Sequence, residues 1–175
     1  MKIRTMQSAE LNRIRDIDRS ETIRTTYVQR GEKIVAMDVH WVDTGWVEGD
    51  GDHSFGQMIR GAEHYVELDG TAIGAFDGER LIGIAIYRPR LTDTMAQLAL
   101  LHVSNAYRRQ GLASRLFEEI VRFARADGSA ELYVSATPTE SAVGFYMSRG
   151  FAPTTTPDPD LLEAEPDDIH MVLHL

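Results

Sequence analysis

The sequence predicts a single α/β domain whose mixed, mostly antiparallel sheet is flanked by helices. Apolar runs of strand length recur along the chain and are separated by glycine, proline and aspartate turns. Other segments repeat apolar residues at helical spacing. The length of 175 residues, 43% of them hydrophobic, suits one domain with one sizeable core. We therefore expect one domain over residues 1–175.

The first seventy residues are expected to form a variable region beside this sheet. Residues 1–5 suit a short strand, and Ser8 is placed to cap a helix over residues 11–17 that ends near Ser20. Segments 25–29 and 34–41 carry many β-branched residues around a central glycine, which predicts a hairpin.

A loop rich in glycine and aspartate is expected over residues 43–54, with Trp41 and Trp46 at its edges. Two interpretations stay open. The loop could be a substrate lid or a partner contact, or the two tryptophans could pack on the hairpin, which we favour because large apolar groups are seldom left in water. Ser54 is then expected to cap a helix that ends near Leu68.

The remaining elements follow from turn signals. An Asp-Gly pair between apolar runs predicts a hairpin, and a later Asp-Gly pair predicts the end of a helix. We expect strands over residues 72–76, 81–87, 95–103, 130–135 and 169–175, helices over 112–127 and 138–149, and turns over 89–93 and 154–159.

The turn between the strand that ends at Val103 and the next helix has the composition of an anion site. It reads Arg108-Arg109-Gln110-Gly111-Leu112-Ala113. The first N–H groups of a helix lack carbonyl partners and carry the positive end of the helix dipole, so an anion is favoured there. An ordinary connection with solvated arginines is the alternative. A Walker loop would need Gly-Lys-Ser/Thr, and a dinucleotide fold would need three spaced glycines, and both are absent.

The turn resembles the pyrophosphate-binding signature of the GNAT superfamily of N-acetyltransferases, in which arginine, two residues, glycine, one residue and then glycine or alanine follow each other. The segment from Thr139 to Phe151, with its Phe145-Tyr146 and Gly150-Phe151 pairs, is similar to the second conserved stretch of that family. The resemblance covers residues 71–156 well and the first seventy residues poorly. It implies an acetyl-CoA-binding core over 71–156, with residues 157–175 as a connection and closing strand.

The resemblance also implies where acetyl-CoA binds. In the family, the strand before the turn splays from its neighbour, so that the pantetheine arm pairs with backbone near Leu101 and Val103, and the Val103 N–H would stabilise the oxyanion. Thr139 stands in place of a common asparagine, and Ser135 is a further candidate. The full set of expected cofactor-binding residues is Leu101, His102, Val103, Arg108, Arg109, Gln110, Gly111, Leu112, Ala113, Ser114, Thr139, Ser141 and Tyr146.

The catalytic groups are only partly defined. Tyr146 matches the position of the family's general acid, although packing beside Phe145 would also explain a tyrosine here. Gln97 stands where several members carry a glutamate, and because an amide cannot accept a proton at neutral pH, it could act only by positioning a water. His102 is the other candidate base, but it could equally be structural and should point away from Leu101 and Val103.

Composition narrows the class of protein. With 27 acidic and 18 basic residues, the formal charge is −9, which disfavours nucleic acid and anionic membranes and would suit an amine substrate, although it could merely serve solubility. There is no cysteine, and no metal site is expected. No signal peptide or long apolar run is visible, so we expect a cytoplasmic protein.

Three functions are compatible with these observations. The first is acetyl transfer from acetyl-CoA to a primary amine of a small molecule or protein. The second is an acyl-CoA sensor without turnover, suggested by Gln97. The third is a structural or partner-binding protein that uses the tryptophan loop. Apolar edge strands in the hairpin and tail would also allow a homodimer.

Overall fold

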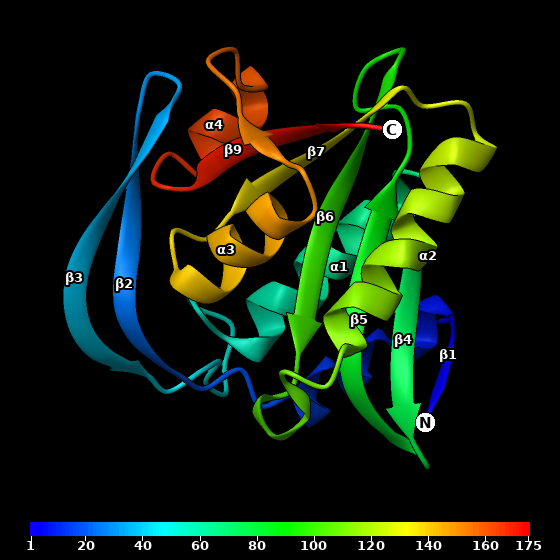
Figure 1. Ribbon diagram of the computed structural model, residues 1–175. Helices are drawn as coiled ribbons and strands as arrows, with labels where there is room; N and C mark the ends of the chain where they lie inside the picture. Colours follow the sequence, from blue (N-terminus) through cyan, green and yellow to red (C-terminus); the bar gives the residue numbers. More distant parts are fainter.

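The computed structural model describes residues 1–175 and has a seven-stranded sheet in the order β1-β4-β5-β6-β7-β9-β8. All neighbouring strands are antiparallel except β6 and β7, which run parallel (Figure 1). The elements are β1 (Lys2–Thr5), η1 (Ser8–Asp16), β2 (Glu21–Arg30), β3 (Lys33–Asp43), α1 (Phe55–Glu67), β4 (Thr71–Asp77), β5 (Arg80–Arg88), β6 (Met95–Val103), η2 (Asn105–Tyr107), α2 (Leu112–Ala126), β7 (Glu131–Ala136), α3 (Glu140–Ser148), β8 (Ala152–Pro153), α4 (Pro159–Ala164) and β9 (Ile169–His174).

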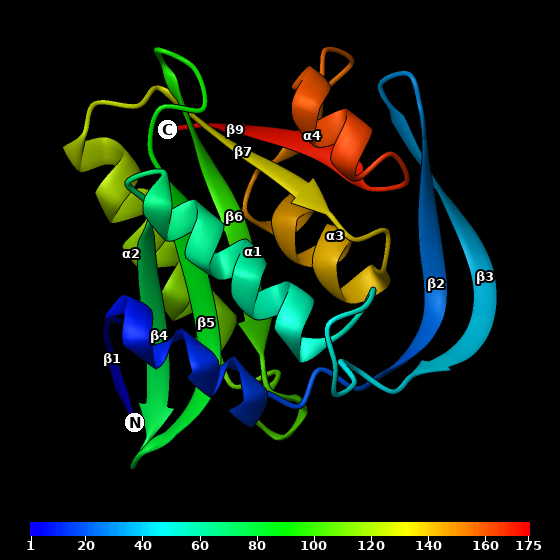
Figure 2. The ribbon, with the colours of Figure 1, turned by 180° about the vertical axis from the view of Figure 1, so that it is seen from behind.

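Helices cover both faces of the sheet and create two cores. The apolar stripe of α2, including Leu116 and Ile120, packs with β4, β5, β6 and β7 on one face, and α3 joins the same core through Val143 and Tyr146. The opposite face is covered by α1 and η1, which bury Ala62, Leu11 and Ile14 (Figure 2). Because β5 is buried on both faces, its sequence is a continuous apolar run.

The two parallel strands separate at the middle of the sheet. β6 pairs with β7 only at Met95–Gln97 opposite Glu131–Tyr133, although both strands continue beyond this point. The pairing of β5 with β6 is interrupted by a bulge between Ile86 and Tyr87. Bulges bend a strand and increase its twist. The second half of β6 therefore leaves β7, which confirms the expected splay.

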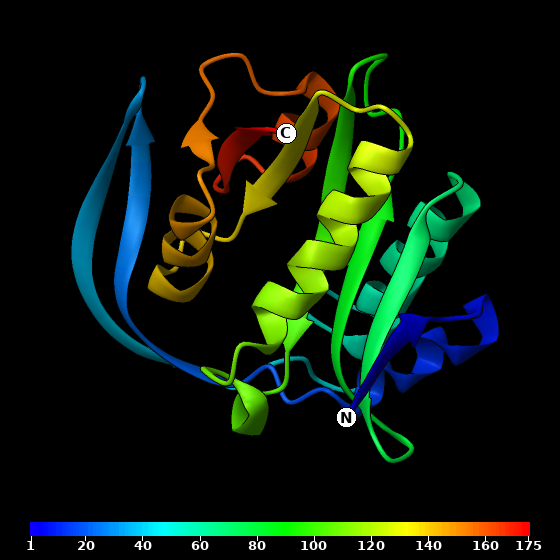
Figure 3. The ribbon, with the colours of Figure 1, turned by 45° about the vertical axis from the view of Figure 1, so that its right-hand side comes forward.

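The hairpin of β2 and β3 forms a separate two-stranded sheet beside α3 (Figure 3). The Tyr27 N–H donates to the Pro138 carbonyl at 3.0 Å, and Thr26 forms a β-bridge with Thr139, so β2 is attached to the connection that precedes α3. This attachment places the hairpin at the edge of the region where β6 and β7 diverge.

Most predicted elements are confirmed, with shifted ends. The strand expected over residues 95–103 has those bounds, and the Ser54 side chain caps α1 by accepting from the Gln57 N–H at 3.1 Å. Such a cap is worth about 1 kcal/mol. The hairpin strands are longer than expected, because β2 and β3 continue pairing to Glu21 and Asp43.

Three expectations about the variable parts were wrong. The first helix is a 3-10 helix that ends at Asp16, and its cap is Gln7 rather than Ser8. A short helix, α4, lies within the C-terminal connection, where only turns were expected. Trp46 is buried, but against Phe55 and His102 rather than on the hairpin, whereas Trp41 lies on β3 and is 48% exposed.

Candidate active site

The turn between β6 and α2 presents a row of unpaired backbone donors. None of the N–H groups of residues 109–114 donates a hydrogen bond within the chain, and α2 has no side-chain cap at its first residue. No side-chain oxygen accepts a hydrogen bond from these amides either, and the side chains of Arg108, Gln110 and Arg149 donate to other acceptors. Six consecutive free donors at the positive end of a fifteen-residue helix form a site for an anion with several oxygens.

The backbone of the turn is left-handed at two positions. Arg109 has a φ of 58°, and Gly111, the N-cap residue of α2, has a φ of 77°. A Cβ added at Gly111 would meet no atom within 4 Å, so the protein itself does not require a glycine there for space. Glycine satisfies the conformation and leaves that space clear.

The arginines near this turn have other roles than the sequence led us to expect. Each nitrogen of the Arg108 guanidinium has a partner in the chain: Nε donates to the Val103 carbonyl at 3.1 Å, Nη2 donates to the Arg19 carbonyl at 3.1 Å, and Nη1 lies 3.4 Å from Glu21. Arg108 therefore holds the end of β6 against the N-terminal connection. Arg149 is the cation that sequence reasoning missed, since its Nη2 donates to the Ser114 hydroxyl at 2.5 Å.

A cavity of about 830 Å³ lies where β6 and β7 diverge. One wall is the free half of β6, from Leu98 to Val103, and another is formed by the end of β7 and the start of α3. The turn before α2 closes one end, and Trp46, His53 and Met58 line the opposite side. Leu101 and Val103 pack toward the α2 core, while Leu100 packs toward the α1 core, so the β6 residues from Leu100 onward alternate between the two faces.

Tyr146 lies at the centre of this arrangement. Its side chain lines the cavity and is only 6% exposed, yet its hydroxyl makes no hydrogen bond in the chain. No side-chain oxygen without a partner is sealed from solvent, so the hydroxyl opens into the cavity. Burial, and then the negative charge of Asp168, raise the pKa of this hydroxyl above its usual value. Tyr146 is therefore protonated at neutral pH, and its proton faces the cavity.

Gln97 is not brought into the cavity. It lies in the part of β6 that is still paired with β7, it is 2% exposed, and its Oε1 accepts from Arg88 Nη1 at 3.1 Å. The water-positioning role expected for Gln97 has no geometric support. Its side-chain amide instead accepts a hydrogen bond from Arg88 within the sheet.

His102 lines the cavity but is a weak base. Its ring lies 4.7 Å from the Trp46 ring, edge on, and on the opposite face from Leu101 and Val103, as the alternation of the strand predicts. Burial, with the positive charges of Arg19 and Arg108, lowers its pKa to about 3. A group with that pKa is neutral at pH 7 but accepts a proton poorly.

The hydroxyl residues at the other wall also line the cavity. Thr139 is the N-cap residue of α3, and its Oγ1 accepts a hydrogen bond from the Ala142 N–H at 3.4 Å. The same oxygen lies 3.2 Å from the Ser141 hydroxyl. The Ser135 hydroxyl lies 3.4 Å from His170 Nδ1. Thr139 therefore orders the start of α3, which carries Tyr146, whether or not it also contacts a ligand.

Asp168 is the titratable cavity residue that sequence reasoning missed. Ile169 pairs with Ala136 at the end of β7, so the preceding residue reaches the edge of the cavity. Burial, followed by the charges of Glu165 and Asp167, raises the pKa of its carboxyl to about 7, against a smaller opposing effect of Arg19. Asp168 makes no ion pair of its own, whereas Arg19 pairs with Asp43 at 2.5 Å.

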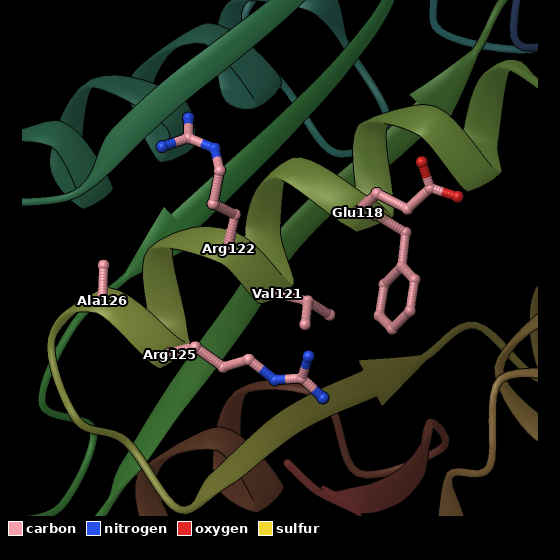
Figure 4. A pocket seen from close by; sticks show the side chains of 6 residues that line it. Glu118, Val121, Arg122, Arg125 and Ala126 are labelled. Atoms are coloured by element: carbon pink, nitrogen blue, oxygen red, sulfur yellow. The ribbon is translucent and has the colours of Figure 1, made fainter.

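A second hollow lies on the outside of α2 (Figure 4). All six residues that line it come from this one helix, and Figure 4 shows Arg122 and Arg125 extending in different directions over its surface. A surface with walls from a single helix cannot enclose a ligand. The candidate functional site is therefore the cavity between β6 and β7.

The fold and the cavity define a protein of the class that holds an extended anionic cofactor between two splayed strands. A family model described as "Acetyltransferase (GNAT) domain" matches residues 48–174. The chain belongs to the GNAT family of acetyltransferases. None of its helices is long and apolar enough to cross a lipid bilayer.

Individual relatives agree with this assignment. Human N-acetyltransferase 8B is 33% identical over 81 residues, which cover 43% of this chain and 36% of the relative, so the match spans about a third of that protein. Nourseothricin acetyltransferase shares 15% identity with a TM-score of 0.73, over 99% of this chain and 97% of the other. The PaiA N-acetyltransferase of Thermoplasma acidophilum, crystallised with coenzyme A, shares 16% identity with a TM-score of 0.64, over 99% and 98% of the chains. These structures share the fold over the full length, including the first seventy residues.

Proposed function

We propose that this protein transfers an acetyl group from acetyl-CoA to a primary amine, by direct attack of the amine while both substrates are bound. The observation that carries the proposal is the row of six unpaired N–H groups at residues 109–114, next to a glycine with open space beside it. A diphosphate offers several oxygens at the spacing of such a row. Membership of the GNAT family supports the same cofactor.

The residues of the cavity suit the shape of acetyl-CoA. The turn from Arg109 to Ser114 would hold the pyrophosphate, with Arg149 as an added cation. The free half of β6 would pair with the pantetheine arm near Leu101 and Val103, because β7 has already diverged there. Bound acetyl-CoA supplies the activated acyl group, and the N–H of Val103 would stabilise negative charge on its carbonyl oxygen.

Tyr146 is the proposed general acid. Its hydroxyl opens into the cavity, has no competing partner and stays protonated at neutral pH. It would donate its proton to the departing thiolate of coenzyme A, which would otherwise leave as an anion in a largely apolar space. A phenol is a weaker acid than a thiol, so proton transfer from Tyr146 to the thiolate is unfavourable by itself. It is completed when the tyrosinate takes up the proton that the nitrogen of the new amide loses.

The acceptor is proposed to be an amine of a small molecule or protein that enters on the side lined by Trp46, His53 and Met58. The name of nourseothricin acetyltransferase, which shares the fold over its whole length, favours a small molecule for testing first. A panel of nourseothricin, kanamycin, 1,4-diaminobutane and a lysine-containing peptide covers both kinds of acceptor. Transfer of labelled acetyl to at least one of them is the expected result.

Calorimetry with coenzyme A tests the placement of the cofactor. Gly111→Glu introduces a negative side chain beside the turn and should weaken binding at least about tenfold through repulsion. Gly128→Glu is the matched control, since Gly128 lies at the other end of α2, also has positive φ and also has open space around its Cβ. Equal affinity of the two variants would overturn the placement.

An acyl-CoA sensor is the second candidate, because neither Gln97 nor His102 provides a competent base. The two functions differ in turnover. Coenzyme A binding without acetyl transfer to any panel amine, and without any effect of Tyr146→Phe, would favour the sensor.

Self-association is a further part of the proposal. The β2–β3 hairpin forms its own sheet and exposes large apolar side chains, namely Val28, Val35, Met37, Trp41 and Val42. Two copies could cover these surfaces by pairing hairpins about a twofold axis. Sedimentation equilibrium should give a dimer that Met37→Asp dissociates, and a monomer at high micromolar concentration would overturn this part. A cytoplasmic location stays a prediction.

A further inference from the structure

The end of α4 and its connection to β9 contribute five consecutive residues, 164–168, to the wall of the cavity. Asp168 is the residue of this segment nearest to β9, and it is partly buried, whereas its acidic neighbours Glu165 and Asp167 are exposed. Tyr146 lines the same cavity from α3, is nine-tenths buried and has a free hydroxyl. The carboxylate and the phenol act on each other electrostatically. A proton acceptor and a proton donor thus face one space from different elements.

We propose that Asp168 is the general base of the reaction, which removes a proton from the ammonium group of the acceptor before that amine attacks the thioester. The inference rests on the proposed acetyl transfer and adds to it a base that neither sequence motif contains. The substrate class that follows is an amine that is protonated at neutral pH, since only such an amine needs the base.

No other group in the cavity meets the geometric and chemical requirements equally well. Gln97 lies outside the cavity and cannot accept a proton, and His102 faces Trp46. Glu21 is occupied by Arg108 at 3.4 Å. Asp168 has no ion-pair partner and faces the cavity with its neighbours Glu165 and Asp167, while the other charged or titratable groups that line it are Arg19, His53, Tyr107, Arg108, Arg109 and Tyr146.

The surroundings of Asp168 suit the task. Its partial burial and the nearby carboxylates bring its pKa to about 7, so at neutral pH it is ionised in part and can take up a proton. An isolated carboxyl on the surface, with a pKa near 4, would be a much weaker base toward an ammonium group. The like charges of Glu165 and Asp167 therefore strengthen Asp168 as a proton acceptor.

Two protein groups, Asp168 and Tyr146, account for every proton that moves in the reaction. The ammonium gives one proton to the Asp168 carboxylate, and the nitrogen lone pair then forms the bond to the carbonyl carbon. The carbon–sulfur bond breaks with its electron pair on sulfur, the thiolate takes the proton of Tyr146, and the tyrosinate recovers a proton from the nitrogen of the new amide. Asp168 later releases its proton to solvent, so the products are an amide, free coenzyme A and one proton.

The two groups are also coupled in the useful direction. The negative charge of Asp168 contributes to the raised pKa of Tyr146. Once Asp168 has taken the ammonium proton it is neutral, and that contribution disappears. The pKa of Tyr146 then falls at the stage at which the phenol must give up its proton to the thiolate. Removal of the first proton therefore makes the second transfer easier.

The test compares three variants with the best acceptor of the panel. For the wild type, kcat/KM for the amine should rise with pH through a limb near pH 7, because the carboxylate must be ionised. Asp168→Asn should lower the plateau about 100-fold or more and abolish the limb. Asp168→Glu should restore part of the rate. Asp167→Asn should move the limb to lower pH, because one of the charges that raise the pKa of Asp168 is lost, and it should lower the plateau far less than Asp168→Asn does.

A measurement without turnover decides the same point. Carbon-13 labelling of the aspartate carboxyls should give one resonance that titrates near pH 7 in the complex with coenzyme A and is missing in Asp168→Asn. An unchanged pH limb in that variant, or aspartates that all titrate below about pH 5, would overturn the inference. Coenzyme A affinity should be equal in all variants. Loss of coenzyme A binding by the wild type itself would instead count against the proposed function.

Discussion

Tyr146 and Asp168 line one cavity from two different elements, and the charge of the carboxylate raises the pKa of the phenol. Both side chains reach this cavity because α3 packs on the α2 side of the sheet while β9 pairs with β7 and begins opposite Ala136. Both residues have backbone hydrogen bonds, but neither the Tyr146 hydroxyl nor the Asp168 carboxylate has a hydrogen-bonding partner within the chain.

Asp168 should make the protein less stable above neutral pH. Its folded-state pKa of about 7 lies above the unfolded value near 4, so its contribution to stability is present below pH 4 and is lost as pH rises through 7. Asp168→Asn removes this dependence. At pH 8 we expect the variant to unfold at a higher urea concentration than the wild type. Its free energy of unfolding should be larger by about 2 kcal/mol, after allowance for the partial exposure of Asp168.

The comparison at low pH is the control for that prediction. At pH 4.5 the folded chain is protonated at this carboxyl, and the pH lies only about half a unit above the unfolded pKa, so little of the destabilisation has developed and the difference between variant and wild type should shrink to below about 1 kcal/mol. A variant that is less stable at pH 8 would show that Asp168 makes a favourable contact instead. Urea titrations at both pH values separate these outcomes.

Tyr146→Phe should lower kcat by about 100-fold and change the KM for acetyl-CoA much less, because the lost proton serves the departing thiolate. Tyr133→Phe is the matched control. The Tyr133 hydroxyl lies 2.7 Å from His170 Nδ1 and accepts from the Asp158 N–H at 3.1 Å, so its loss should cost about 1 kcal/mol of stability and leave kcat nearly unchanged. Equal kcat values for wild type and Tyr146→Phe would assign Tyr146 to packing.

Arg149→Ala should weaken coenzyme A binding about three- to tenfold, and the effect should shrink at 1 M salt, because the guanidinium lies beside Ser114 at the start of α2. Arg122→Ala is the control, since Arg122 lies further along α2 and pairs with Glu119 at 2.6 Å. Calorimetry at low and high salt measures both. Identical affinities for the two variants would place the phosphates away from Arg149.

The sequence predicted the parts of the site that are contiguous in the chain. The strand, glycine turn and helix around Gly111 could be recognised because free amides, left-handed backbone and helical periodicity all leave local signals. The splay of β6 from β7 was expected from the family resemblance. Tyr146 was identified from its motif and does line the cavity. Its role as an acid stays a prediction.

Residues that reach the site through tertiary pairing left no such signal. Asp168 is one of several acidic residues in the C-terminal connection, and only the pairing of Ile169 with Ala136 brings it to the cavity. Arg149 depends on how α3 packs against the start of α2. Conversely, Gln97 shares a strand with the cavity residues but precedes the point of divergence, so it does not line the cavity, which its place in the strand sequence alone could not reveal. The short α4, six residues that begin with proline, is too brief for periodicity to reveal.

The last prediction separates His102 from Asp168 as the base. Because the pKa of His102 is lowered to about 3, its protonation state does not change between pH 5 and 9. His102→Asn should therefore lower the rate only by disturbing the packing against Trp46, and the limb of kcat/KM near pH 7 should stay where it is in the wild type. Proton NMR of the histidine ring should show no titration above about pH 5 for His102. If His102→Asn removed the limb and Asp168→Asn kept it, the histidine would be the base. Burial beside Trp46 would then lower the pKa of His102 less than we expect.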